Sequence, residues 1–99
     1  MKLSTKQKAY LKSLGQTMQP TVRIGKLGMT PEVTESAEVA IKANELIKVK
    51  VLSKTSPIES QEALQELAKS VKAEVIQTIG HNGLLYRKND QKNGIEFPS

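Results

Sequence analysis

The sequence predicts an α/β fold, a compact single domain whose elements follow the order α-β-α-β-α-β-β and form a four-stranded mixed sheet. A length of 99 residues fits one hydrophobic core. Apolar residues make up 37% and charged residues 25%, which is typical of a packed globular chain. Helix-period and strand-like segments alternate, and right-handed crossovers would join the strands into one sheet. We expect residues 1–88 to form the domain and 89–99 a flexible polar tail.

The first two elements are bounded by local signals. A capping box starting at Ser4 and a glycine at position 15, suited to the site just beyond a helix end, predict a helix over 5–14. The β-branched run 21–24 is stopped by Gly25 and predicts a strand that enters a glycine turn. The acid-free helix would spread its lysines over the exposed surface.

The second helix and strand follow directly. Thr30 can act as an N-cap and is followed by a proline, a residue suited to the first helical position, so a helix is predicted over 31–44. Residues 46–52 alternate apolar side chains with lysine. This period of two indicates a strand with one lysine-bearing face, formed by Lys48 and Lys50.

A third helix and a hairpin complete the domain. A capping box starting at Ser56 predicts a helix over 57–71. Segments 74–79 and 84–87 are strand-like, and residues 80–83 between them favour the positive φ angles of tight turns. We therefore expect an antiparallel hairpin.

Charge is distributed unevenly along the chain. The net charge is +5, which suggests an anionic partner such as nucleic acid or an acidic membrane surface. Residues 1–29 contain no acid, whereas residues 30–47 are rich in glutamate. The cations of the first segment are Lys2, Lys6, Lys8, Lys12, Arg23 and Lys26. Such clustering is expected of a phosphate-binding face, although a solubilising lysine surface explains the charge equally well.

The residues offer little chemistry for catalysis or metal binding. The chain has no cysteine and one histidine, His81, which falls in the expected hairpin turn and could contact RNA by stacking. We expect no enzymatic activity, no metal and no cofactor. No apolar run approaches the roughly 20 residues of a membrane span, so a cytoplasmic monomer without a membrane partner is expected.

One short motif remains, the G-x-x-G of Gly25-Lys26-Leu27-Gly28. It matches neither nucleotide-binding glycine motif. Two glycines three apart let a loop approach a sugar-phosphate chain closely, as in the G-x-x-G loop of KH domains. An ordinary strand-to-helix turn is the alternative. The preceding strand, the capped helix that follows and the basic flanks favour RNA binding.

Four segments of the chain, 22–30, 45–51, 79–80 and 84–87, carry a pattern that covers about residues 2–88 together with the first helix. In this pattern the chain resembles a known family, the CRM domain (chloroplast RNA splicing and ribosome maturation) in its stand-alone bacterial form. The resemblance implies a fold similar to the carboxy-terminal domain of translation initiation factor three, with the G-x-x-G loop and nearby basic surface contacting RNA. Bacterial members are associated with precursors of the large ribosomal subunit, and plant organellar members with intron splicing.

The predicted RNA-binding residues combine the loop, the first helix and basic strand positions. They are Arg23, Gly25, Lys26, Leu27, Gly28, Lys2, Lys6, Lys8, Lys12, Lys48, Lys50 and Arg87. A plain solvated strand face is the alternative for the last three. Relatives often differ at Leu27 and Asn44, so we assign no function to those two side chains.

The resulting hypothesis is a non-catalytic protein that binds ribosomal RNA in pre-50S particles during ribosome biogenesis. The low aromatic content of 3% favours recognition of RNA shape and backbone over base sequence. Two alternatives stay open. In one, the acidic and apolar surface of the second helix docks a ribosomal or assembly protein; in the other, which the lack of an acid–base pair disfavours, the chain is a small enzyme acting on RNA.

Overall fold

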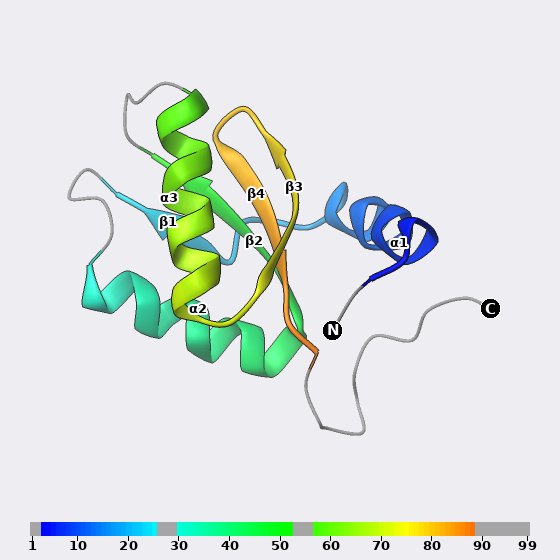
Figure 1. The fold of residues 1–99 in the computed structure, drawn as a ribbon. Coiled ribbons are helices and arrows are strands. Elements are labelled where there is room, and N and C mark those ends of the chain that lie inside the picture. The colour runs from blue at the N-terminus through cyan, green and yellow to red at the C-terminus, as the bar shows by residue number, and fades with distance from the viewer. Residues whose placement is uncertain (1–2, 26–29, 53–56, 89–99) are drawn as a thin grey trace.

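The computed structural model describes residues 3–25, 30–52 and 57–88 (Figure 1). It confirms the predicted element order, with bounds close to those expected. The elements are α1 (Thr5–Gly15), β1 (Val22–Ile24), α2 (Pro31–Asn44), β2 (Leu46–Val51), α3 (Pro57–Ser70), β3 (Glu74–Ile79) and β4 (Asn82–Tyr86). The predicted tail, 89–99, lies outside the described residues.

The four strands form one mixed sheet in the order β1-β2-β4-β3. β1 runs parallel to β2, and β4 pairs antiparallel with both β2 and β3. The last strand, β4, therefore lies between β2 and β3, and β1 and β3 form the two edges of the sheet. The sheet predicted from the sequence is therefore confirmed, and its register places Arg23, Lys50, Asn82 and Ile79 in one row across the four strands.

Each helix begins or ends where local chemistry satisfies its free backbone groups. The backbone N–H of Gln7 donates to Ser4 Oγ at 3.1 Å, and that of Ser4 donates to Gln7 Oε1 at 2.9 Å, which confirms the capping box. α3 ends in a Schellman motif in which the Ala73 N–H reaches the Ala68 carbonyl at 2.7 Å. Lys72 occupies its left-handed position with φ 56°, where glycine is the usual residue.

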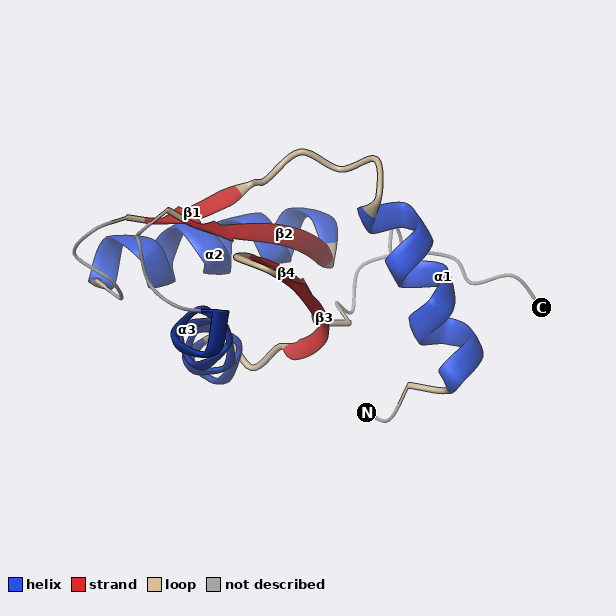
Figure 2. Ribbon diagram, turned by 90° about the horizontal axis from the view of Figure 1, so that it is seen from above, coloured by secondary structure: helices blue, strands red, loops and turns tan. Residues whose placement is uncertain are grey.

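The helices pack on opposite faces of the sheet (Figure 2). Leu64 and Leu67 of α3 and Ile41 of α2 bury one face together with Ile47 and Val49 of β2. On the other face, α1 packs over a smaller cluster. That cluster comprises Leu3, Leu11, Leu46, Ile76, Leu84 and Tyr86. Among the described elements, α1 is the one that covers this second face, and part of the face is left uncovered by the elements described.

Two glycines have functions that differ from those predicted. Gly15 closes α1 as its last residue without a positive φ, and glycine is needed there because a Cβ would collide with the Leu84 side chain. Gly83 lies buried within β4, where a Cβ would come within 2.7 Å of Leu64 Cδ1. The turn is accordingly shorter than predicted. It consists of Gly80 and His81, and Gly80 has φ 57°.

Candidate RNA interface

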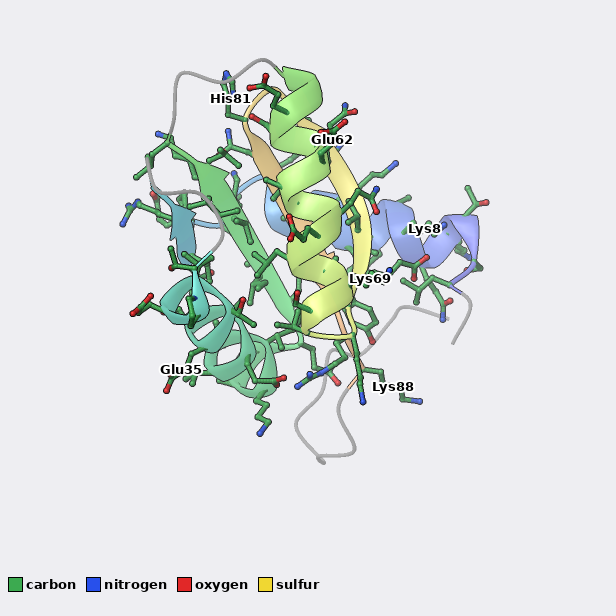
Figure 3. The ribbon with its side chains drawn as sticks, turned by 60° about the vertical axis from the view of Figure 1, so that its left-hand side comes forward. Lys8, Glu35, Glu62, Lys69, His81 and Lys88 are labelled. Carbon is green, nitrogen blue, oxygen red and sulfur yellow. The ribbon has the colours of Figure 1, made fainter. Side chains whose placement is uncertain are left out.

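Charge separates across the sheet. α1 carries lysines and no acid, whereas α2 and α3 on the opposite face carry six glutamates. Figure 3 shows Glu35 and Glu62 projecting from α2 and α3, and Lys8 from α1. Among the described strand residues on the α1 face, Glu74 is the one acidic residue, and its carboxylate lies 3.7 Å from Lys8 Nζ. The α1 face is therefore the side of the domain suited to a polyanion.

Arg23 and Lys50 form the cationic part of the open half of this face. They are direct partners in the parallel pairing of β1 with β2, so their side chains project side by side. Val22 and Ile24, which flank Arg23 along β1, are buried against the opposite layer, and this orients Arg23 toward the α1 face. Both cations are exposed. The predicted lysine-bearing strand face thus gains an arginine from the neighbouring strand.

Lys48 lies on the same face as Lys50 but is held by the protein. Its Nζ donates to the Gly15 and Met18 carbonyls, each at 3.4 Å, and the side chain is half-buried. A cation at this position supplies hydrogen bonds to carbonyls at and just after the end of α1, and it interacts favourably with the negative end of the helix dipole. Lys48 therefore fixes the segment after α1 against the sheet.

Arg87 lies on the other side of the sheet. Its Nη2 is 2.8 Å from Glu38 Oε2, and its Nη1 donates to Glu38 Oε1 at 3.2 Å and to the Val71 carbonyl at 2.9 Å. The hydrogen bond from Arg87 lowers the pKa of Glu38 below its ordinary value of 4.5. This guanidinium links α2, β4 and the end of α3, and the structure does not bring it together with the cations of the α1 face.

Gly25, at the end of β1, differs from the other glycines. Its φ is outside the left-handed region, and a Cβ built on it would meet no atom of the described residues within 4 Å. The described fold therefore does not require glycine here, whereas it does at Gly15 and Gly83. A glycine with open space around it permits close approach by another backbone. The remaining loop positions, Lys26, Leu27 and Gly28, lie outside the described residues, as does Lys2.

The end of the sheet next to Gly25 is tied together by the hairpin. The Val51 N–H donates to the His81 carbonyl at 2.8 Å, and His81 Nδ1 lies 2.7 Å from Ser60 Oγ. This serine–histidine contact joins residues 21 positions apart, so no local sequence pattern indicates it. Ser60 is 0% exposed, so a substrate cannot reach its hydroxyl, and the pair holds the hairpin against α3.

The described residues contain neither a metal-binding cluster nor a helix that could span a membrane. Within 3–25, 30–52 and 57–88, no three His, Cys, Asp or Glu side chains are grouped closely enough to hold a metal ion. No helix in those ranges has both the length and the apolar character needed to cross a membrane.

The sequence pattern of the CRS1/YhbY (CRM) domain family matches residues 3–87. The chain belongs to this family. An RNA-binding protein of Haemophilus influenzae is 39% identical over 97% of this chain and 95% of its own length. The "Probable RNA-binding protein YqeI" of Bacillus subtilis is 31% identical over 97% and 99%.

A solved structure shares the CRM domain fold. The solution structure of a hypothetical protein from Staphylococcus aureus, described as a candidate RNA-binding protein, superposes with a TM-score of 0.83. It is 32% identical, and the match covers 98% of this chain and all of that one. The family resemblance and the fold class predicted from the sequence are both confirmed.

Proposed function

We propose that this CRM domain binds RNA with the α1 face of its sheet and the loop that begins at Gly25. The observation that carries the proposal is the separation of charge across the sheet, which leaves one face cationic and the other acidic. A polyanion is attracted to the first face and repelled from the second, so RNA would approach from one side. The names of the relatives support RNA as the ligand. The open space at Gly25 supports backbone contact by the loop.

The proposed target is ribosomal RNA in precursors of the large ribosomal subunit. This part rests on the resemblance to the bacterial members of the family. We propose that the chain acts there as a cytoplasmic monomer, by binding and not by turnover. The phosphate contacts would come from Arg23, Lys50, Lys26 and the lysines of α1, while Arg87 and Lys48 stabilise the domain.

A charge reversal in the loop tests the proposal. Lys26→Glu should weaken both binding to purified ribosomal RNA and cosedimentation with pre-50S particles. Lys69→Glu is the matched control, because Lys69 is an exposed lysine of α3 on the acidic side. Unchanged binding by Lys26→Glu in both assays would exclude the loop. Affinity of the wild-type chain should also fall steeply between about 50 and 200 mM salt, and a flat profile would contradict the cationic face.

One observation favours a second function, docking to a protein. Val39 of α2 is 63% exposed, and Glu35 and Glu38 lie on the same helix. An apolar side chain in an acidic surrounding suits a basic ribosomal protein. Val39→Ser would then abolish cosedimentation with particles and leave binding to purified RNA intact. If the variant keeps both cosedimentation and RNA binding, the docking function is excluded.

A further inference from the structure

A hollow of about 130 Å³ lies on the open half of the α1 face. Three amide side chains line it, those of Gln16, Gln77 and Asn82, together with the apolar Ile79 and Leu84. Its volume is about four times the roughly 30 Å³ that one water molecule takes up in the liquid, so it has room for a small planar ring. None of these five residues is among the RNA-binding residues predicted from the sequence.

The hollow belongs to the same surface as the exposed cations. Asn82 of β4 is the register partner of both Lys50 of β2 and Ile79 of β3. Lys50 in turn is the partner of Arg23. One row therefore crosses four strands, from two cations through an amide to an apolar side chain. Neighbouring strands are about 4.8 Å apart, so the row extends about 14 Å.

The three amide groups of the hollow are available to a ligand, whereas Lys48, which also lines it, is held by the Gly15 and Met18 carbonyls. Within the described residues, the side chains of Gln16, Gln77 and Asn82 make no hydrogen bond. Ile79 is 64% exposed, the highest exposed fraction among the large hydrophobic residues described. Three unused amides and an exposed apolar side chain around one hollow are not explained by packing.

A nucleobase has the matching chemistry. Its edges carry hydrogen-bond donors and acceptors. The side chain of Asn or Gln can pair with both, because it has a carbonyl acceptor and an NH₂ donor. Its flat faces are apolar enough to pack on Ile79 and Leu84. In A-form duplex RNA the information-rich groove is too deep and narrow for side chains, so a base can enter such a hollow only from an unpaired segment.

We propose that this hollow binds an unpaired base of the RNA, with Gln77 and Asn82 hydrogen-bonding its edge and Ile79 packing on its face. Arg23 and Lys50 contact the adjoining phosphates. The inference rests on the proposed function and deepens it, because it makes single-stranded RNA the ligand class. It also supplies base contact through amides in a chain that has few aromatic side chains to stack on bases.

The first experiment compares short single-stranded oligonucleotides of A, of C and of U with an RNA duplex of similar length, using the full chain. The wild-type chain should prefer single strands and bind one of the three most tightly. Asn82→Ala and Gln77→Ala should each weaken binding to that oligonucleotide about threefold to tenfold, as expected for loss of one hydrogen bond, and reduce its advantage over the others. Gln61→Ala removes an exposed amide of α3 as the matched control.

Salt dependence separates base contact from phosphate contact. The amide variants should keep the wild-type slope of log affinity against log salt, whereas Lys50→Ala should weaken all three oligonucleotides alike and reduce the slope by about one. Equal binding of duplex and single strands, or amide variants that behave like Gln61→Ala, would overturn the inference while RNA binding itself stands. Failure to bind any RNA would refute the proposed function instead.

Crosslinking gives a result that does not depend on a variant folding. A single-stranded oligonucleotide carrying 4-thiouridine is irradiated with the wild-type chain, and the modified peptide is identified by mass spectrometry. Crosslinks within residues 77–84 are expected. Crosslinks confined to α2 or α3 would place the base elsewhere and overturn the inference.

Discussion

Replacing Gly25 by alanine separates the demands of RNA binding from those of the fold. Within the part of the chain that the structure describes, a Cβ at this position meets no atom within 4 Å, and φ is not in the left-handed region. Gly25→Ala should therefore fold with unchanged stability, or gain up to about 1 kcal/mol because alanine restricts the unfolded chain. If RNA backbone passes close to this residue, the methyl group should disrupt about one charge-assisted contact. That corresponds to about 1–2 kcal/mol, or about fivefold to thirtyfold in affinity.

Gly83→Ala is the comparison, with the opposite expectation. The new Cβ would lie 2.7 Å from Leu64 Cδ1, and Leu64 is 0% exposed, so it has no space into which to move. Overpacking of this kind costs about 1–3 kcal/mol. In a domain of this size each kcal/mol lowers Tm by about 4–8 °C.

Thermal unfolding followed by circular dichroism measures the stability of both variants. Fluorescence anisotropy with a labelled fragment of large-subunit ribosomal RNA measures their affinity. The expected pattern is a stable Gly25→Ala that binds weakly and an unstable Gly83→Ala that binds normally while folded. The reasoning fails if Gly25→Ala lowers Tm as much as Gly83→Ala does, or if it binds RNA with wild-type affinity.

Further predictions follow from the buried polar contacts. Lys48→Met should lower the free energy of unfolding by about 0.5–1.5 kcal/mol in urea titrations, because the Nζ bonds to two carbonyls are lost, whereas Lys50→Met should leave it unchanged. Arg87→Ala should cost about 1–2 kcal/mol of stability without changing RNA affinity in the anisotropy assay. Because the pKa of Glu38 is lowered in the folded state, its carboxylate stabilises the fold above pH 4.5, and this stability is lost as the pH falls through the folded-state pKa. Arg87→Ala should remove this part of the acid dependence of Tm. Burial raises the pKa of Tyr86 above its ordinary value of 10.0, so the contribution of its neutral hydroxyl to the stability of the fold is complete below pH 10 and is lost as the pH rises through the folded-state pKa. Tyr86→Phe should therefore make Tm less sensitive to alkali.

The elements of the fold could be predicted because their signals are local. The capping box at Ser4, the N-cap at Thr30 and the alternation through Lys48 and Lys50 each lie within a few residues of the structure that they specify. The ends of α2 and α3 were predicted to within one residue, at 44 and 71, although neither is followed by a glycine. Beyond the end of α3, Lys72 occupies the left-handed position, and the C-cap residue after α2 is Glu45 with φ 60°. Neither residue type marks a helix end in a sequence.

The candidate site was less predictable because it depends on contacts between distant segments. Lys48 and Lys50 are equivalent in the alternating pattern, yet only the position of α1 decides that Lys48 bonds to the Gly15 carbonyl while Lys50 stays exposed. Arg87 finds Glu38 across 49 residues of sequence. The row from Arg23 to Ile79 exists only through strand register, which no local pattern encodes.

Charge separation and the open half-face together determine how RNA can lie on the domain. α1 occupies one end of its face, over Leu46 and Tyr86, so the open surface lies between α1 and the Gly25 end of the sheet. Its cations are set toward β1, next to Gly25, and its amides toward β3. A backbone held at Gly25 and Arg23 would therefore direct its bases toward Asn82, while the acidic α2 and α3 layer disfavours RNA on the opposite face of the sheet. Binding at the loop and binding in the hollow should then be coupled. Asn82→Ala should weaken binding less in the Gly25→Ala background than in the wild-type chain, because an RNA not anchored at the loop reaches the hollow less often, and strict additivity in this double-mutant cycle would contradict a shared path.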